Sequence, residues 1–520
     1  ALQWLGGDLG GGYFAGVTPA LQGSWLAVLG YGALGVLAAI LGGWWPALAV
    51  RGLAPAQALK GVPMQPGHAP SGARAWVGPA LMALGAALCL LPPVAGLPLG
   101  AYMGIAALLV GGILALPAAV TRALSWLAPR AARRPLALLA VERARRYPGS
   151  AAVATSGVVA SLALSVALTV MVGSFRQSMM TWLDAVLPAD LYVRALAGGR
   201  DAATLDPVFI DAVRRLPGVV RVDGQRQRTL ILDPQRPPVT LLARPLRDAQ
   251  GAVPATLPLP LVGLAQPLPP AADAVGVWVS EAVVDLYGAQ VGQSIALPGL
   301  GPAGTRFVVV GVWRDYARQQ GSVVLDAADF ARLTGDTAIN DLAVFLAPGA
   351  AAEPLQRQIE ALAAGQVQVS SAQAIRRISM NIFDRSFAVT YWLQAIAIGM
   401  GLMGVSASFS AQVLVRRREF GLLRHLGLSR AQVLGLVTAE GALWTVLGAV
   451  AGLALGLAVS TVLVHVVNPQ SFHWTMELAV PIGRLAALAL AVVAAGTLTA
   501  WASGRLAVRR EAVLAVREEA

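Results

Sequence analysis

The chain has 520 residues, of which 56% are hydrophobic and only 13% are charged, and its mean hydropathy is +0.65. This composition excludes an ordinary soluble globular protein, because several apolar runs reach the length that spans a bilayer. The net charge of +12 does not indicate nucleic-acid binding, since the basic residues lie in short segments beside the apolar runs and form no patch interleaved with aromatic side chains.

Seven apolar stretches are predicted to be membrane-spanning helices, since each comes near or above the roughly twenty residues that a bilayer requires. They cover residues 24–49, 76–97, 99–121, 148–174, 388–415, 432–466 and 480–504. The uncharged stretch 76–120 is too long for one crossing, and prolines and glycine at 92–98 predict a turn at its middle. We therefore expect a helical hairpin in this region.

An amphipathic helix is predicted at 133–147, where leucine and valine alternate with arginines, and Pro148 is expected to end it. Such a helix would lie at the membrane interface as an elbow before the next span. Two roles stay open for it, anchoring in lipid headgroups and a part in coupling motion.

One polar block, residues 175–387, separates the fourth and fifth apolar stretches. It carries nineteen Arg and nineteen Asp or Glu, so it contributes nothing to the net charge. Its sequence alternates strand-like with helix-like runs, which predicts an α+β domain. The expected strands are 229–232, 239–242, 277–279 and 307–312, with a weaker one at 219–222, and the expected helices are 206–216, 280–288 and 351–364.

The remaining basic residues indicate how the chain is oriented. Nineteen of the twenty fall in four short segments, which hold only five acids and cover residues 51–75, 122–147, 416–430 and 505–520. Counting the crossings places all four on one side of the membrane and the polar block on the other. Because short basic loops stay in the cytoplasm, this pattern predicts a bacterial inner-membrane protein with residues 175–387 in the periplasm and a cytoplasmic C-terminus.

Two motifs and the order of the parts carry a resemblance to a known family. One motif is RRREFGLLRHLGLSR at 416–430, and the other runs from VWVSE at 277–281 through VGQ at 291–293 to VVGVWRDY at 309–316. The parts follow in the order amphipathic helix, one span, large exported domain, three spans and basic tail. Together these features resemble the FtsX/MacB-type permeases of ABC transporters, in particular the duplicated, YbbP-like members.

The resemblance implies five parts. Residues 1–60 would be the end of a first FtsX-like repeat with one transmembrane helix, and 61–130 a transmembrane hairpin linking the repeats. The second repeat would comprise the elbow helix and first transmembrane helix at 131–174, a MacB-like periplasmic domain at 175–387, and a three-helix FtsX-like permease domain with a basic tail at 388–520. A chain so composed would be an N-terminally truncated duplicated permease, which the echo of LAVR at 48–51 and 506–509 supports.

The loop 416–430 is the candidate contact with an ATPase, since the resemblance implies that this segment couples the two proteins. Its leucines are expected to lie on one helical face that docks into a groove, with its charged residues around that face. Its glycines are expected to allow close approach of the partner and to end the helix. The alternative is an ordinary basic loop on lipid headgroups. The candidate coupling residues are Arg418, Glu419, Gly421, Leu422, Leu423, Arg424, Leu426 and Gly427.

The span 432–466 contains two further features. Glu440 lies inside the apolar stretch, and ionisable groups at such depth are costly enough to be functional candidates. Structural pairing inside the bundle and a direct part in coupling both stay open for it. Gly448, Gly452 and Gly456 form a GxxxGxxxG ladder, which predicts a helix-packing seam within the chain or between two permease halves.

Several chemical sites are not expected in this chain. The only lysine, Lys60, is followed by Gly61, so there is no P-loop and ATP with Mg²⁺ would be bound by a partner subunit. The four histidines are scattered and indicate no metal site. No Gly-x-Ser-x-Gly elbow suggests a hydrolase. We therefore expect a non-catalytic permease subunit without a cofactor of its own, partnered by a cytoplasmic ABC ATPase that acts as a dimer.

The leading functional interpretation is that ATP hydrolysis by the partner moves the periplasmic domain, a mechanism called mechanotransmission. By analogy with the family, the cargo would be lipids, lipoproteins or hydrophobic compounds that are exported or extracted. Membrane lipids and a periplasmic protein are further expected partners. A regulator that moves an extracytoplasmic enzyme without transport is the first alternative, and an ion-coupled secondary transporter, supported only by Glu440, is the second.

Overall fold

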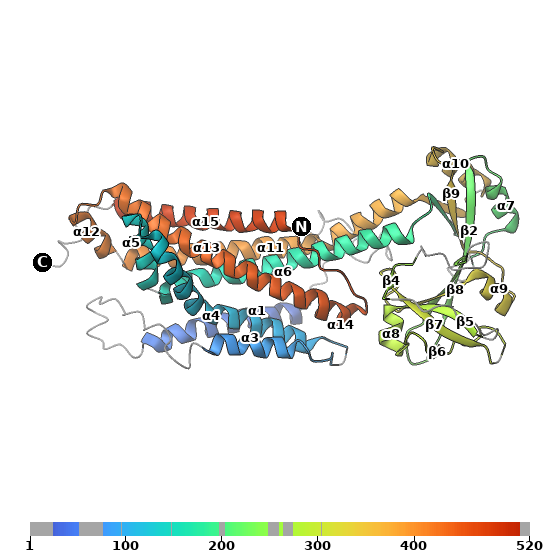
Figure 1. Cartoon of the computed structure of the whole chain (residues 1–520), viewed down its shortest axis with the longest axis horizontal. Coiled ribbons are helices and arrows are strands. Elements are labelled where there is room, and N and C mark those ends of the chain that lie inside the picture. The colour runs from blue at the N-terminus through green and yellow to red at the C-terminus, as the bar shows by residue number, and fades with distance from the viewer. Residues whose placement is uncertain are drawn as a thin grey trace.

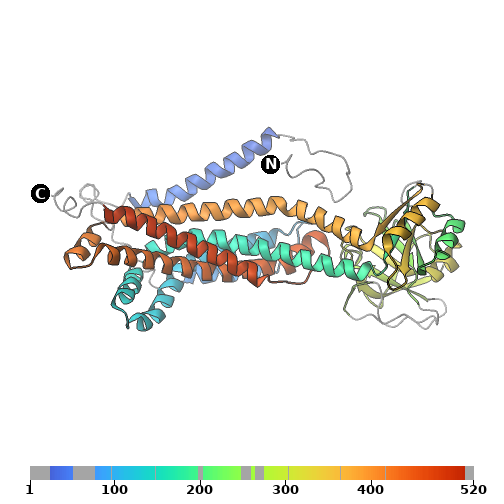
Figure 2. The same ribbon diagram turned by 90° about the horizontal axis from the view of Figure 1, so that it is seen from above.

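The computed structural model describes residues 24–50, 76–94, 96–146, 148–196, 203–247, 259–263, 274–302, 304–363, 365–415 and 417–509. Within these residues the molecule is elongated, with a helical bundle that carries an α+β domain at one end (Figures 1 and 2). The basic segment 51–75 and most of the basic segment 505–520 lie outside the described residues.

The bundle contains helices of very different lengths. They are α3 (Val77–Leu88), α4 (Leu99–Ala131), α5 (Pro135–Arg146), α6 (Pro148–Val186), α11 (Ala372–Val415), α12 (Arg417–His425), α13 (Arg430–Val462), a π-helical turn (Leu463–Val467), α14 (Asn468–Phe472) and α15 (Ile482–Arg509). Helix α1 (Trp25–Val50) runs apart from the bundle in Figure 2, and its described side chains are exposed. Among the described residues, six helices are long and apolar enough to cross a membrane.

The described residues contain six helices of spanning length where seven spans were predicted, and the difference lies in the predicted span 76–97. Its helix α3 has only 12 residues and ends at Leu88, before the two prolines. At 1.5 Å per residue it is about 18 Å long, short of the roughly 30 Å of a bilayer's hydrocarbon core. The hairpin itself is present, because α3 packs along α4. A Cβ atom at Gly78 would lie 2.7 Å from the backbone nitrogen of Ala115, so the two backbones are in direct contact.

Two predicted spans are parts of much longer helices. The stretch 148–174 lies in the 39-residue helix α6, and the stretch 388–415 lies in the 44-residue helix α11. The α+β domain therefore covers residues 187–371, here called the inserted domain, and is shorter at both ends than the polar block 175–387. Hydropathy places these boundaries wrongly because the ends of both helices are polar while their backbones remain helical.

The inserted domain consists of two lobes that share one sheet, in the order β10-β1-β9-β2-β3-β8-β5-β7-β4, with β6 paired to β7. Its strands are β1 (Leu191–Ala195), β2 (Val219–Leu230), β3 (Val239–Arg244), β4 (Leu261–Val262), β5 (Ala274–Ser280), β6 (Ser294–Ile295), β7 (Arg306–Trp313), β8 (Ser322–Asp326), β9 (Asp341–Leu346) and β10 (Val367–Ser371). Its helices are α7 (Pro207–Arg214), α8 (Glu281–Tyr287), α9 (Ala327–Thr334) and α10 (Ala352–Leu362).

Strand β2 runs through both lobes, because its first half pairs with β9 and its second half with β3. The small lobe packs α7 and α10 against β1, β9 and β10, and the large lobe packs α8 and α9 against β3, β5, β7 and β8. Each lobe has its own apolar core. The five runs predicted as strands lie in β2, β3, β5 and β7, although residues 231–232 fall beyond the end of β2, and the three predicted helices correspond to α7, α8 and α10.

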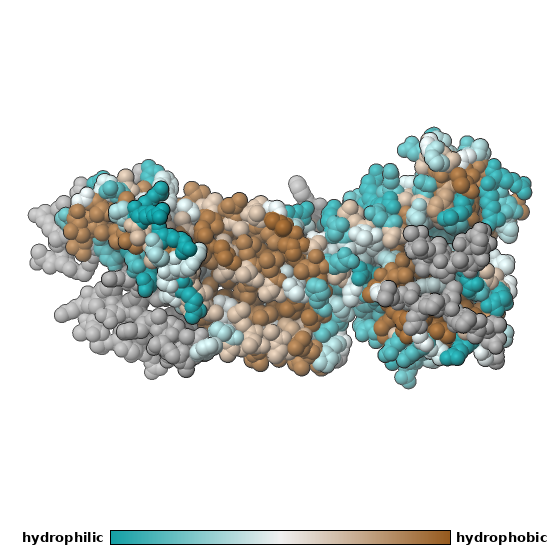
Figure 3. Space-filling model, in the orientation of Figure 1, coloured by the Kyte–Doolittle hydropathy of each residue, from teal (hydrophilic) through white to brown (hydrophobic). Residues whose placement is uncertain are grey.

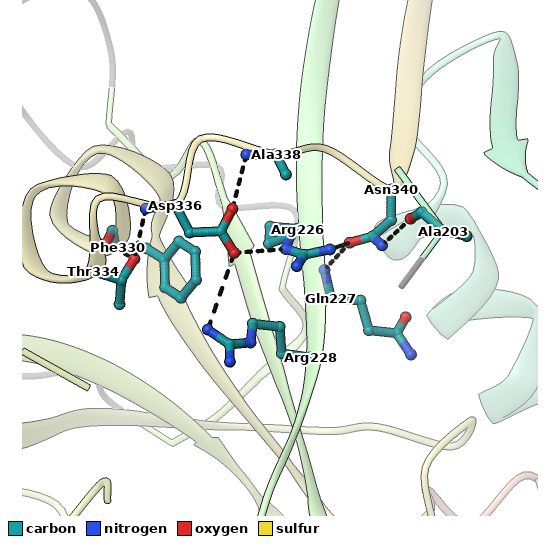
Figure 4. Close-up of polar contacts among 9 residues, drawn as sticks. All are labelled: Ala203, Arg226, Gln227, Arg228, Phe330, Thr334, Asp336, Ala338 and Asn340. Carbon is teal, nitrogen blue, oxygen red and sulfur yellow. Dashed lines mark hydrogen bonds and ion pairs between the residues drawn. The ribbon is translucent and has the colours of Figure 1, made fainter. Parts of the chain in front are cut away.

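A polar network fixes the segment between α9 and β9 against β2 (Figure 4). Arg226 donates to the Asp336 carboxylate over 3.0 Å, and the Asn340 side chain accepts from the backbone of Gln227 over 2.7 Å. Burial alone would raise the pKa of Asp336. Hydrogen bonds from the Ala338 backbone and from Arg226 outweigh burial, so the pKa is lowered below its ordinary value. The network ties the chain that crosses between the lobes to the strand that both lobes share.

The face of the bundle seen in Figure 3 is apolar along its middle and more polar toward both ends, and this apolar middle is here called the apolar belt. The helix α12, within the loop 416–430, lies at one end of this apolar belt, and the inserted domain lies at the other (Figure 1). This is the relation between the two segments that the predicted sidedness requires. The structure is thus an α-helical polytopic membrane protein with an inserted α+β domain, as the sequence predicted.

Candidate functional site

The loop 416–430 folds into the short helix α12 and a tightly defined turn. The backbone nitrogen of Leu428 bonds the carbonyl of Leu423 and that of Gly427 bonds Arg424, the two bonds of a Schellman motif. Gly427 has the φ of +96° that this motif needs. The side chain of Ser429 then caps α13 in a capping box with Gln432. These hydrogen bonds close the turn, so α12 is joined stiffly to α13.

The apolar residues of α12 lie on two different faces. Phe420 and Leu423 pack inward against Val433 and its neighbours at the start of α13. Leu422 and Leu426 are 64% and 78% exposed. The expectation that Leu423 shares their docking face is therefore wrong, because Leu423 lies about 100° around the helix from Leu422, on the side that meets the bundle.

The charged residues of the loop also differ in what they contact. The carboxylate of Glu419 lies 3.1 Å from the guanidinium of Arg143 on α5, so it points toward the bundle. Arg424 is partly exposed on α12. The side chain of Arg418 lies outside the described residues. Gly421 has open space beside it, since a Cβ atom at this position would have no neighbour within 4 Å.

Glu440 is buried in the bundle, three turns into α13. Its carboxylate lies 3.6 Å from Nε of Arg143, the same arginine that contacts Glu419. Helix α5 reaches this position because Ala140, Val141 and Ala144 are buried against the bundle, where α5 packs on α4 and α13. The predicted interfacial helix is therefore packed on one side against protein.

Sequence reasoning missed Arg143 as a member of this site. The only clue in the sequence is that an intramembrane acid needs a counter-ion. Five arginines of the predicted interfacial helix could supply it, and spacing along that helix does not choose among them.

The glycine ladder of α13 packs against α6 of the same chain. A Cβ atom at Gly448 would lie 3.2 Å from the side chain of Val158, and one at Gly456 would lie 2.6 Å from that of Val166. At Gly452 the neighbour is Leu162, 3.1 Å away. The ladder is thus a seam between two helices of one bundle.

At the other end of the bundle, α6 and α11 leave it together and enter the inserted domain (Figures 1 and 2). Arg176 on α6 forms an ion pair with Asp384 on α11, and Arg376 on α11 pairs with Asp184 on α6 over 3.1 Å. Phe175 contacts the rings of Phe383 and Phe387 between them. The two helices form a cross-linked pair, here called the stalk.

The loop 473–481, between α14 and α15, makes a separate contact with the large lobe. The backbone nitrogen of Thr475 donates to Glu281 over 3.1 Å, and Arg314 donates to the Thr475 hydroxyl over 3.0 Å. The Tyr316 hydroxyl donates to the Thr475 carbonyl. Burial raises the pKa of Tyr316, so it keeps the proton that it donates. His473 also meets Asp285 on α8. We call this contact the clasp.

No group of three or more metal-ligating side chains gathers among the residues that the structure describes. Several features described above have a geometry suited to transmitting motion. They are a stiff, partly exposed helix at one end of the bundle, a stalk and a clasp at the other, and an arginine that joins α5 to two carboxylates.

Two family models match this chain in the parts just described. The FtsX-like permease C-terminal model matches residues 377–512, and the MacB-like periplasmic core domain model matches residues 151–362. The chain therefore contains an FtsX-like permease domain and a MacB-like periplasmic core domain, and it is similar to ABC transporter permeases. The resemblance stated from the sequence is confirmed, and this permease is a multi-pass membrane protein.

Two curated relatives are also permeases by their names. The uncharacterized ABC transporter permease protein Rv0987 of Mycobacterium tuberculosis is 29% identical over 425 residues, which are 77% of this chain and 48% of the relative. The uncharacterized ABC transporter permease MJ1507 of Methanocaldococcus jannaschii is 22% identical over 166 residues, 30% of this chain and 42% of the relative. This permease thus spans about half the length of the curated relatives it matches.

Two solved structures overlap with part of the permease. The periplasmic region of MacB from Actinobacillus actinomycetemcomitans is 13% identical, covers 38% of this chain and 96% of its own, and has a TM-score of 0.27. The extracellular domain of the transporter YknZ from Gram-positive bacteria is 12% identical, covers 35% of this chain and 98% of its own, and has a TM-score of 0.24.

Proposed function

We propose that this permease couples ATP hydrolysis by a separate cytoplasmic ATPase to motion of the inserted domain in the periplasm. The observation that carries the proposal is the continuity of the stalk. Helices α6 and α11 have 39 and 44 residues, which at 1.5 Å per residue makes them about 58 and 66 Å long. Each is roughly twice as long as the hydrocarbon core is thick, so the same rigid element reaches from the far end of the bundle into the domain.

The stalk is suited to carry displacement because its two helices are held together where they leave the bundle. The ring of Phe175 packs against those of Phe383 and Phe387 between them, and the partly exposed ion pairs of Arg176 with Asp384 and of Arg376 with Asp184 add to this contact on the domain side. Arg376 also donates to the carbonyl of Leu187, at the point where the chain leaves α6. A shift of one helix along its axis is therefore passed to the other and to β1, which follows.

The ATPase would dock on α12. Leu422 and Leu426 form a small exposed apolar surface at the end of the bundle opposite to the inserted domain, and exposed apolar side chains of this kind are suited to a groove in a partner protein. The Schellman turn and the capping box between α12 and α13 keep the two helices in a fixed orientation, so a displacement of α12 would also displace α13. In this proposal ATP and Mg²⁺ belong to the partner, and the permease is not itself catalytic.

The cargo class is proposed by analogy with the family as lipids, lipoproteins or other hydrophobic compounds that are exported or extracted. A regulator of an extracytoplasmic enzyme would use the same parts, and the two functions separate on what stimulates ATP turnover. A lipid or hydrophobic compound that stimulates turnover supports transport. The ion-coupled secondary transporter remains the weaker alternative, because it rests on Glu440 alone and the carboxylate of this residue lies beside Arg143.

The proposal is tested by purifying the permease with candidate ATPases encoded by neighbouring genes. Leu422→Glu and Leu426→Glu should each abolish the complex and the stimulated ATP turnover, because they place a charge on the docking surface. Leu362→Glu is the matched control, since Leu362 is also exposed but lies on α10 of the inserted domain. Complex formation that survives both α12 substitutions would refute docking at this helix.

A further inference from the structure

We infer that Arg143 is a positioning residue of the coupling site, which ties α12 to the start of the stalk helix α6. The inference rests on the proposed function, because α12 is taken as the element that the ATPase moves. It concerns how that movement reaches the second stalk helix, which has no direct chain connection to α12.

Helix α12 is connected along the chain to α11 and α13 but not to α6. Helix α12 follows α11 after one residue and precedes α13 by a short turn. A displacement of α12 therefore acts directly on one stalk helix, α11. The other stalk helix, α6, is preceded by α5, which ends at Arg146, two residues before α6 begins at Pro148. A firm contact between α12 and α5 thus adds a route from the docking surface to the first turn of α6, beside the packing of α6 against α11 and α13.

Arg143 supplies this contact with one guanidinium that faces two carboxylates. It lies 3.1 Å from Glu419 on α12 and 3.6 Å from Glu440 on α13. Its planar group also lies over the ring of Phe420 on α12, 5.4 Å from the ring centre. Three side chains from two helices converge on one side chain of α5. Arginine suits this position because its rigid fork can serve two carboxylates at once, whereas lysine offers a single point charge.

The burial of the group gives the contact its strength. The side chains of Arg143 and Glu440 are only 12% and 6% exposed, and Glu419 is 38% exposed. Exposed ion pairs contribute little, but removal of one member of a buried pair leaves a charge without its counter-charge. The buried pair with Glu440 fixes the guanidinium, and the more exposed carboxylate of Glu419 attaches α12 to it.

Packing also holds α5, the helix that carries Arg143, firmly against the bundle. Ala140, Val141 and Ala144 are buried against the bundle on the same helix. Helix α5 is therefore held by its apolar face and by Arg143 together. A displacement of α12 that preserves the Arg143–Glu419 contact must move α5, and with α5 the first turn of α6. The two stalk helices then receive the same displacement.

The inference predicts that α5 and α12 keep a fixed distance. Spin labels at Leu136 on α5 and His425 on α12, both exposed, measure that distance in the permease after Cys89→Ser replaces the single native cysteine. The wild-type background should give one narrow distance distribution, unchanged when the ATPase and ATP are added. Glu419→Ala should broaden it, since this change cuts α12 from Arg143 and leaves the buried pair intact.

Two further variants and one activity measurement complete the test. Arg143→Gln should broaden the distribution as Glu419→Ala does, and Arg145→Gln is the matched control, because Arg145 lies on the same helix but is half exposed and pairs with Glu142. In the complex, Glu419→Ala and Arg143→Gln should lower the stimulated ATP turnover, because α12 is no longer tied to α5, while the ATPase still binds.

The outcomes separate the inference from the proposed function. Distance distributions for Glu419→Ala and Arg143→Gln that are as narrow as that of Arg145→Gln would overturn the inference, whatever the ATPase does. A wild-type permease that binds no candidate ATPase would instead count against the proposed function. The distance measurement needs no partner and still decides whether Arg143 joins the two helices.

Discussion

Gly456 shows how little space a single residue has on the seam between α13 and α6. A Cβ atom there would lie 2.6 Å from Val166 and 2.8 Å from the carbonyl oxygen of Ala163, whereas Gly435 on the same helix has nothing within 4 Å. Alanine improves helix propensity at both positions by about 1 kcal/mol. At Gly456 this gain is opposed by the cost of overpacking the seam, which is about 1–3 kcal/mol.

We therefore expect Gly456→Ala to lower the melting temperature of the detergent-solubilised permease and Gly435→Ala to leave it unchanged or raise it. Thermal unfolding followed by intrinsic fluorescence measures both. Equal melting temperatures for the two variants would show that the seam is looser than the distances indicate.

The carboxylate of Asp336 gives the inserted domain a dependence on pH. Its pKa in the folded state is lowered, so its contribution to stability is present above the unfolded value of about 3.9 and is lost as the pH falls through the lower folded value. At neutral pH, Asp336→Asn should lower the free energy of unfolding by about 1.5–3 kcal/mol, the range for a hydrogen bond to a charged group.

The measurement is unfolding by denaturant at pH values from neutral to acid. The difference between wild type and Asp336→Asn should shrink below pH about 4, where the wild-type carboxyl takes up a proton. Asp211→Asn removes an exposed ion pair with Arg214 and serves as control, since such pairs contribute little at any pH. A difference that stays constant across the range contradicts the network of Figure 4 as its source.

Individual residues also show where sequence reasoning stops. The helical period predicts that Leu422 and Leu426 share a face, and they do. It does not say which side of a short helix meets the bundle, and for this reason the prediction for Leu423 is wrong. Arg143 cannot be chosen among five arginines, because its selection depends on how α5 packs against α13.

At the scale of elements, the helices and strands with strong local sequence patterns are the ones best predicted from the sequence. The runs of β-branched residues in β3, β5 and β7 are found from sequence alone. The strands β1, β9 and β10 escape prediction, and their place in the sheet comes from pairing with one another across more than a hundred residues of sequence. The ends of α6 and α11 escape it because hydropathy reports the membrane, whereas these helices continue into water.

The continuity of the stalk is an element-scale property with its own prediction. Thr181 lies on the exposed side of α6, between the bundle and the inserted domain. Thr181→Pro removes one helical hydrogen bond, at a cost of about 3 kcal/mol, and kinks the helix there. We expect ATP turnover and ATPase binding to persist while cargo-dependent stimulation is lost.

Thr181→Ala is the control for this change, because it removes the same side chain and keeps the helix. Stimulation of turnover by a lipid or hydrophobic compound, compared between the two variants, is the measurement. A proline variant that responds to cargo as the alanine variant does would show that displacement does not pass along α6.

At the scale of the whole molecule, the two ends of the apolar belt should face different compartments. His425 on α12 and Glu353 on α10 are both exposed, at opposite ends of the structure. In a Cys89→Ser background, a membrane-impermeant maleimide added to intact spheroplasts should label Glu353→Cys and leave His425→Cys unlabelled. Lysis should make His425→Cys reactive. Labelling of both variants in intact spheroplasts would contradict the proposed orientation.

The clasp determines how the inserted domain is supported. The stalk helices α6 and α11 both enter through the small lobe, where β1 and β10 are neighbours, whereas the clasp holds the large lobe at α8 and the end of β7. The loop of the clasp is itself fixed to the stalk, because the backbone nitrogens of Glu477 and Ala479 donate to the hydroxyls of Ser178 and Ser174 on α6. Helix α6 thus contacts the small lobe through β1 and the large lobe through this loop, so a displacement of α6 is expected to reach both lobes, which β2 joins.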